Sequence, residues 1–202
     1  MARWIFEPGH SAATFAVRHM MVSQMRGQFK NVQGSIDFDP DNPAGGAAVE
    51  TTIDAAGIWS GDDERDAHLR DADFLNVAAY PDIVFRSTGV RCTGEADFQV
   101  TGDLVLRGVT RPVVLATRYL GRWQCPYWDG DRDLGPTLRI GFVATTTINR
   151  HDFGVSWNAP LDRGGWVVGD EIAITLDAEA ILESDMQRIA GMLQAREARA
   201  DG

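Results

Sequence analysis

The residues of this chain best suited to do chemistry are its histidines, which can move protons or bind metal ions near neutral pH. There are four of them: His10, His19, His68 and His151. None lies in an H-E-x-x-H motif or a C-x-x-C pairing, so the spacing indicates no metal site, although distant histidines can converge in a fold. A hydrolytic triad of His10, Ser11 and Asp66 would depend on folding alone, and no G-x-S-x-G turn is present. We therefore expect no catalytic residue, no metal and no enzyme activity, with each histidine hydrogen-bonded at the rim or wall of the fold.

The charge balance narrows the possible partners. The chain carries 29 acidic and 19 basic residues, a formal net charge of −10. Nucleic-acid binders need a positive field, so we expect no nucleic acid partner. The same charge opposes docking on an anionic membrane by charge alone. No apolar run approaches the ~20 residues of a membrane helix, so we expect no stable membrane insertion.

The cysteines and the opening residues bear on the cellular compartment. Cys92 and Cys125 form neither a disulfide framework nor a metal motif, which suits a reducing compartment. The chain opens Met-Ala-Arg-Trp-Ile-Phe, without a basic region followed by an apolar one. We therefore expect no secretory signal and a cytoplasmic location.

Most of the chain alternates apolar and polar residues with a period of two, which is typical of half-buried strands. In the clearest run, one face carries Leu138, Ile140, Phe142, Ala144, Thr146 and Ile148. This run ends in a polar corner of Asn149, Arg150 and Asp152 before Gly154, which we predict to be structural. Gly27 and Gly34 interrupt other strand patterns and predict the bends of a closed barrel.

Three segments depart from this alternation. Ser60 opens a capping box, and we predict one helix over residues 61–76, with a candidate break near 71–73. Residues 121–136 are rich in glycine, proline and aspartate, which predicts a long loop, either a functional loop or a packed Ω-loop. A second helix is predicted from Asp185 to about Arg196. Its apolar stripe consists of Met186, Ile189, Ala190 and Leu193.

These elements predict a barrel domain over residues 1–183 and a helical tail over 184–202. The tail could pack on the outer barrel wall, cover an opening or pair with a second subunit. We favour docking on its own barrel, because four residues make a small interface for a stable dimer. A homodimer stays possible.

Several short motifs occur together and in a fixed order over roughly residues 3 to 182. They are Pro8-Gly-His-Ser11, Arg65-Asp-Ala-His-Leu-Arg70, Tyr80-Pro81, Gly102-Asp-Leu-Val-Leu-Arg-Gly-Val-Thr-Arg-Pro112, Thr145-Thr-Thr-Ile-Asn-Arg-His-Asp-Phe-Gly154 and Val168-Gly-Asp-Glu-Ile172. This set resembles the YceI-like family. The resemblance implies an all-β fold, an antiparallel eight-stranded lipocalin-like barrel with one inserted helix and a C-terminal helix. It also implies non-covalent binding of a polyisoprenoid or other long-chain lipid, and no cofactor besides a bound polyisoprenoid or fatty lipid.

An eight-stranded barrel has the size at which side chains either fill the interior or leave room for one small ligand. The residues alone do not separate these cases, and the resemblance favours an open cavity. We expect its wall to contain Phe15, Val17, Phe29, Ile36, Phe38, Phe85, Phe98, Leu104, Leu106, Phe142, Ala144 and Trp157. Possible contacts to a ligand head group are His10, His19, His68 and Arg107. Two alternatives stay open: an enzyme that acts on a lipid or small apolar substrate through His10, His19 or His68, and a stress or interaction protein with a solid core.

Overall fold

The computed structural model describes residues 1–200, with side chains as far as Arg196. The strands are β1 (Ala2–Phe6), β2 (Ala12–His19), β3 (Ser23–Lys30), β4 (Gln33–Phe38), β5 (Ala47–Asp54), β6 (Ile58–Trp59), β7 (Asp82–Cys92), β8 (Asp97–Leu106), β9 (Val109–Asp129), β10 (Arg132–Asn149) and β11 (Val168–Leu182). The α-helices are α1 (Asp63–Arg70) and α2 (Glu183–Ala200). Short 3₁₀ turns are η1 (Pro43–Gly45), η2 (Ala55–Gly57) and η3 (Arg150–Phe153).

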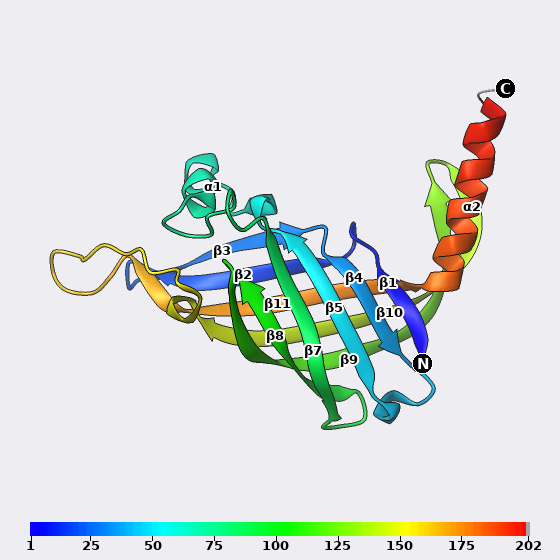
Figure 1. Ribbon diagram of the computed structural model, residues 1–202, viewed down its shortest axis with the longest axis horizontal. Coiled ribbons are helices and arrows are strands. Elements are labelled where there is room, and N and C mark those ends of the chain that lie inside the picture. The colour runs from blue at the N-terminus through cyan, green and yellow to red at the C-terminus, as the bar shows by residue number, and fades with distance from the viewer. Residues whose placement is uncertain (201–202) are drawn as a thin grey trace.

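The strands close into a barrel (Figure 1). The antiparallel order β1-β4-β5-β7-β8-β9-β10-β11 returns to its start, because β1 also pairs with β11. This ring contains eight strands and confirms the predicted eight-stranded antiparallel barrel with an inserted and a C-terminal helix.

The remaining strands extend the wall where the chain bends. β11 pairs with β1 through Ala180–Leu182 and with β2 through Val168–Asp177, so β1 and β2 are two halves of one interrupted wall strand. The next position of the wall is divided in the same way, because β3 pairs with β2 and β4 pairs with β1. The bend lies at Glu7–Ser11, where the Ser11 hydroxyl donates to the Glu179 carbonyl and accepts from the Glu179 amide. Pro8 and Gly9 thus turn the chain between β1 and β2.

The barrel has two unlike ends. At one end lie α1, the β2–β3 turn, the β8–β9 turn and the long connection from β10 to β11; we call this the α1 end. At the other end lie the N-terminus, the tip of the β9–β10 hairpin and α2; we call this the α2 end (Figure 1).

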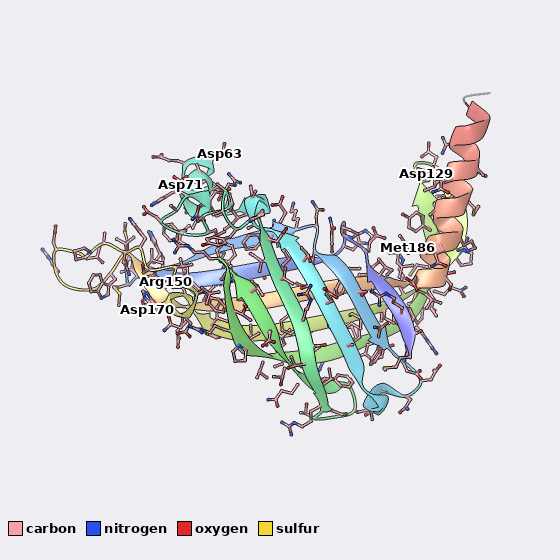
Figure 2. All side chains as sticks on the ribbon, in the orientation of Figure 1. Asp63, Asp71, Asp129, Arg150, Asp170 and Met186 are labelled. Carbon is pink, nitrogen blue, oxygen red and sulfur yellow. The ribbon has the colours of Figure 1, made fainter. Side chains whose placement is uncertain are left out.

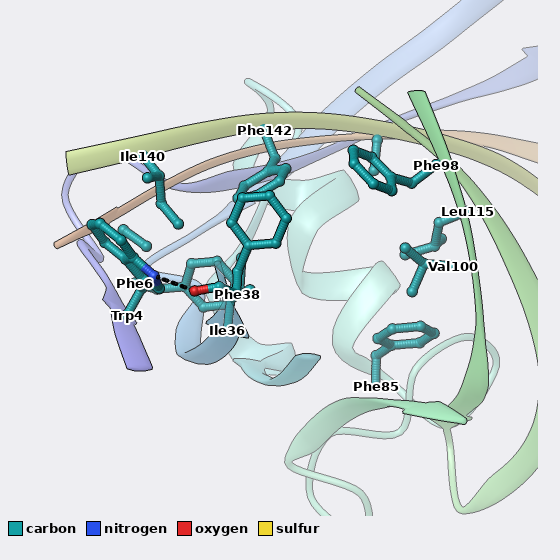
Figure 3. Packing of buried hydrophobic residues seen from close by; sticks show 12 residues of the cluster. Trp4, Phe6, Ile36, Phe38, Phe85, Phe98, Val100, Leu115, Ile140 and Phe142 are labelled. Atoms are coloured by element: carbon teal, nitrogen blue, oxygen red, sulfur yellow. Dashed lines mark hydrogen bonds between the residues drawn. The ribbon is translucent and has the colours of Figure 1, made fainter. Parts of the chain in front are cut away.

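Aromatic side chains fill the barrel near the α2 end (Figure 3). The Phe38 ring lies 5.3 Å from Phe142 and 5.1 Å from Tyr119, both in edge-on contacts. The Trp4 indole N–H donates to the Phe38 carbonyl over 3.1 Å. Since Trp4, Phe38 and Ile140 are fully buried, this cluster seals the interior at that end.

The first helix is shorter than predicted. α1 has eight residues rather than the span 61–76, and its N-cap is Asp62, whose carboxylate accepts from the Arg65 amide. The Ser60 hydroxyl instead donates to Asp66, so the predicted capping box is wrong. The helix ends where Asp71 becomes extended, which is where a break was expected. Residues 71–80 continue as turns, including a positive φ at Asn76.

The predicted loop at 121–136 is also wrong. β9 and β10 run on beyond the barrel as a hairpin that turns at Gly130 and Asp131. Trp123 pairs with Arg139 and Cys125 with Thr137, while Pro126 and Pro136 lie opposite each other. Proline is tolerated in a two-stranded extension because its missing N–H can face away from the partner strand. The high content of glycine and proline in residues 121–136 therefore led to the wrong prediction of a loop.

α2 docks within its own chain as predicted, but it lies on this hairpin beyond the barrel rather than over an opening. Ile189 is only 1% exposed, and the Asp185 carboxylate accepts from the Leu138 amide over 2.8 Å. The Arg188 guanidinium donates to the carbonyls of Leu134 and Pro136 over 2.9 and 2.6 Å. Figure 2 labels Met186 near the start of α2 and Asp129 near the tip of the neighbouring hairpin.

Candidate ligand cavity

An apolar cavity of about 280 Å³ lies inside the barrel. It extends from the aromatic cluster at the α2 end to the segment that contains α1. The strands supply most of its wall, because every second residue of a strand points inward. Eleven of the twelve residues expected to line it do so: Phe15, Val17, Phe29, Ile36, Phe38, Phe85, Phe98, Leu104, Leu106, Phe142 and Ala144. Their contact with a ligand stays a prediction.

Two glycines help to keep the interior open. A Cβ atom at Gly27 would lie 2.4 Å from the Phe15 ring, and one at Gly102 would lie 2.4 Å from the Phe85 ring. Both rings therefore lie against bare backbone, in space that a side chain at either glycine would need. Small and large residues on the strands thus set how much space is left.

The α1 end is closed by residues 55–81, which we call the cover segment. It contributes Leu69, Phe74 and Leu75 to the cavity wall. Beside it, Val155 contributes from the connection between β10 and β11, and Val168 from the start of β11. Sequence reasoning missed Phe74, Leu75 and Val155 because they lie in irregular structure, where no strand parity identifies the inward face, and Leu69 because it lies in α1. The apolar cluster Phe74-Leu75 within a polar segment was the available signal.

Arginines hold the cover segment in place. The Arg107 guanidinium donates to the carbonyl of Ala72 in the cover segment and to that of Gly154 beside it. The Arg70 guanidinium donates to the carbonyls of Ala56 and Ile58, each over 2.8 Å. Arg107 thus joins the cover segment to the connection between β10 and β11. It is not among the residues of the cavity wall.

The other expected site residues lie apart from the cavity wall. Trp157 packs outside it, with its ring 5.0 Å from His68 and 5.3 Å from Phe74. His10 lies near the bend between β1 and β2, where its Nδ1 is 3.1 Å from a Glu179 carboxylate oxygen. His19 ends β2 and pairs with Val168. The structure therefore does not gather the four head-group candidates into one site.

The predicted polar corner is structural. Arg150 is 3% exposed, and its guanidinium donates to the carbonyls of Val155, Trp157 and Gly169 over 2.8, 2.8 and 2.9 Å. Burial lowers the pKa of Arg150, whereas the Asp170 carboxylate, 3.7 Å away, acts in the opposite direction (Figure 2). The Asn149 side chain accepts from the His151 amide and starts η3. Arg150 also borders the cavity at the α1 end.

Few polar atoms reach the cavity. Within the described part of the chain, the Thr117 hydroxyl is buried and has no hydrogen-bond partner. Thr117 belongs to the cavity wall, so this hydroxyl is free to bond a polar atom of a ligand. Such an isolated group among apolar side chains favours a ligand that is almost entirely apolar.

The residues considered for catalysis are not assembled. Asp66 accepts hydrogen bonds from Ser60 at the α1 end, whereas Ser11 bonds to the backbone of Glu179 at the bend. No group of three or more His, Cys, Asp or Glu side chains within residues 1–196 could hold a metal ion. None of the described helices is long and apolar enough to cross a membrane.

Comparison with known proteins places this barrel in a family. The model of the YceI-like domain matches residues 4–180. The chain belongs to the YceI-like family. A UPF0312 protein of Azotobacter vinelandii is 40% identical over 149 residues, which cover 74% of this chain and 73% of that protein. A UPF0312 protein of Ectopseudomonas mendocina is 39% identical over 73% of this chain and 72% of its own length.

Solved structures of YceI-like barrels agree with the fold. The YceI protein of Campylobacter jejuni has a TM-score of 0.64 and 26% identity, covering 82% of this chain and 90% of that one. BcnA of Burkholderia cenocepacia has a TM-score of 0.68 and 22% identity, covering 86% and 98%. A domain from Saccharophagus degradans described as polyisoprenoid-binding has a TM-score of 0.60 and 16% identity, covering 90% and 99%.

Proposed function

We propose that this YceI-like protein binds a long-chain apolar lipid, such as a polyisoprenoid, non-covalently inside its barrel. The observation that carries the proposal is the cavity of about 280 Å³ with an almost wholly apolar wall. Removing a hydrocarbon chain from water contributes ~25 cal/mol per Å² of buried surface, so binding needs no reactive group. The polyisoprenoid-binding domain of Saccharophagus degradans supports the choice of lipid only as an example of the same fold.

The cavity also suggests which shape of ligand fits. Its volume of about 280 Å³ is just below the ~300–1,000 Å³ typical of ligand sites, so a bulky ring system is disfavoured. A flexible chain can follow the barrel from the cover segment to the aromatic cluster. The head group would lie at the α1 end, since the α2 end is sealed. The protein would then carry, store or sequester the lipid without changing it.

Mass spectrometry of an organic extract tests the proposal. The full-length protein is purified without detergent and extracted, and the extract is compared with that of an unrelated protein from the same host. A long-chain lipid in near-stoichiometric amount is the expected result. An empty extract, together with no uptake of added polyprenol, would reject the proposal. Turnover of a prenyl phosphate or ester that is lost on substitution of His10 or His68 would reject the non-catalytic part.

A further inference from the structure

Large apolar side chains are exposed at the outermost point of the α1 end. Met20, Met21 and Val22 form the β2–β3 turn and are 46, 52 and 81% exposed. Trp166, in the connection between β10 and β11, is 56% exposed. We call these four residues the apolar tip. In Figure 1 the connection appears as the gold loop at the left, beyond the end of the barrel wall.

The two segments of the apolar tip form one projection. The Met20 amide donates to the Val167 carbonyl over 2.8 Å. The Met21 side chain lies so close to Gly165 that a Cβ atom there would be 2.8 Å from it. The Arg18 guanidinium donates to the Met21 carbonyl over 2.8 Å and supports the turn. The tip therefore has a defined shape and is not a pair of independent loops.

The β2–β3 turn has a backbone conformation that its own residues rarely adopt. The Val22 amide donates to the His19 carbonyl, so Met20 and Met21 are the central residues of a β-turn. Their φ angles are 46° and 64°, values that favour asparagine and glycine and strain a residue with a long side chain. Local backbone strain together with exposed apolar side chains indicates a surface that contacts another molecule.

The charge of the β2–β3 hairpin differs from that of the whole chain. Residues 8–36 contain none of the 29 acidic residues of the chain. The same stretch contains Arg18 and Arg26, exposed on the half of the hairpin next to the turn, and Lys30, exposed at the far end of β3. Arg163 lies in the opposite segment of the tip, with Asp162 as the acidic residue next to it. The β2–β3 hairpin is thus basic although the whole chain is strongly acidic.

The tip is also continuous with the cavity. It extends from the ends of β2 and β11, whose Val17, Val168 and Ile172 line the cavity beneath the cover segment. A surface that holds the tip would therefore face the α1 end of the barrel.

We propose that the apolar tip docks into the interface of an anionic lipid bilayer and presents the α1 end to it. Methionine, valine and tryptophan enter the boundary between head groups and acyl chains, while the arginines of the hairpin attract anionic head groups. Four side chains offer little area for a second copy of the chain, since a stable dimer buries ~800 Å² per partner. The role in lipid exchange rests on the proposed function; the docking itself does not.

Vesicle flotation tests the docking with the full-length protein. Vesicles of phosphatidylcholine with about one-third phosphatidylglycerol are compared with vesicles of phosphatidylcholine alone. The key variant is Met20→Asn/Met21→Gly, which removes the apolar side chains and supplies the residues that the turn prefers. We expect its thermal midpoint to equal or exceed that of wild type, and its binding to anionic vesicles to weaken by about tenfold or more.

Two further variants serve as controls. Trp123→Ser removes a 77% exposed tryptophan from the α2 end and should leave vesicle binding unchanged. Arg26→Gln should weaken binding to anionic vesicles by roughly fivefold and leave the fold intact. Equal weakening by Trp123→Ser, equal binding to both vesicle types, or no binding by wild type would each overturn the proposal. So would light scattering that shows a dimer which the Met20→Asn/Met21→Gly variant dissociates.

The lipid content of each variant separates this proposal from the proposed function. A Met20→Asn/Met21→Gly protein that still contains extractable lipid but no longer floats with vesicles supports the docking. A wild-type protein that contains lipid but does not float overturns the docking and leaves the proposed function standing. A wild-type protein that floats without containing or taking up lipid overturns the proposed function alone.

Discussion

At the scale of single residues, Arg150 shows how a charged group can serve the fold beside an apolar cavity. Its guanidinium is buried and satisfies the carbonyls of Val155 and Trp157, in a connection without regular structure, and of Gly169 at the start of β11. Such carbonyls need a donor when they are removed from water. Arg150 therefore fixes the wall of the cavity at the α1 end without needing a ligand.

Replacing Arg150 with alanine should lower the free energy of unfolding by about 3 kcal/mol, because several buried carbonyls lose their donor. Urea denaturation measures the change. The matched control is Arg163→Ala, an exposed arginine of the same connection, which should stay within ~0.5 kcal/mol of wild type. An Arg150→Ala protein of unchanged stability that no longer retains lipid would identify Arg150 as a ligand contact instead.

Glu179 makes stability depend on pH at the bend between β1 and β2. Burial by itself raises the pKa of Glu179. The hydrogen bonds from Arg139 and His10 together lower this pKa by a larger amount, so the pKa in the folded protein lies below the ordinary value. A lowered folded-state pKa means that Glu179 stabilises the fold above its unfolded pKa of ~4.3 and stops doing so as pH falls through the folded value.

Glu179→Gln should therefore destabilise the protein at pH 7 and much less at pH 3. Because the side chain is one-third exposed, the loss at pH 7 should be about 1 kcal/mol or less. Urea denaturation at both pH values gives the comparison. Glu50→Gln, which breaks an exposed pair with Arg86, serves as the control with little change at either pH. An equal loss at pH 3 and pH 7 would contradict the assignment.

At the scale of elements, strand β10 carries the cavity on one face and solvent on the other. Ala144 is buried in the cavity wall, whereas its neighbour Thr145 is exposed. Ala144→Trp should occupy the cavity and reduce the lipid recovered per protein severalfold, while Thr145→Trp should leave it unchanged. Both proteins should keep the far-ultraviolet spectrum of the barrel. Equal lipid recovery from the two folded variants would show that the ligand does not reach Ala144.

The inward-facing residues of most strands could be predicted from the sequence. Alternation places Phe15, Phe85 and Phe142 correctly because strand geometry alone decides which face is inward. The contributions of Phe74 and Val155 could not be predicted, because turns have no such rule and tertiary contacts orient them. The β9–β10 extension was missed because its prolines and glycines resemble a loop, and only α2 supplies the packing that makes it a hairpin.

α2 belongs to that hairpin and not to the cavity. Deleting residues 184–202 should leave a folded barrel of unchanged lipid content, since β1 and β11 close the ring without the helix. The thermal midpoint should fall, because the packing of the buried Ile189 and the hydrogen bonds from Arg188 to the hairpin are lost. Calorimetry and organic extraction measure the two effects. Loss of lipid from a folded deletion variant would make the helix part of the ligand site.

At the scale of the whole molecule, one end of the barrel is packed shut and the other is closed by a segment held by a few hydrogen bonds. Aromatic rings around Phe38 occupy the α2 end, and exchange there would require repacking them. The cover segment is joined to its neighbour through Arg107. Ligand exchange should therefore occur at the α1 end.

Arg107→Ala should accelerate release of a bound fluorescent fatty lipid by about tenfold, because two hydrogen bonds that hold the cover segment are lost. Amide exchange over residues 62–80 should rise with it. Arg111→Ala is the matched control: Arg111 donates one bond to the Asp152 carbonyl in the same region and makes no hydrogen bond to residues 55–81. Unchanged release from Arg107→Ala with faster amide exchange would place the exit elsewhere.

The pairing of β1 with β11 has a consequence for how the molecule is made. Trp4 lies opposite Leu182, so the contact that closes the ring joins the two extremes of the described barrel sequence. Contacts of such long range form late and slowly. During synthesis the earlier strands emerge as an open, curved sheet whose apolar face has no partner until β11 arrives. In that interval the future interior is accessible along its whole length, and a lipid chain that settles there is enclosed when the ring closes.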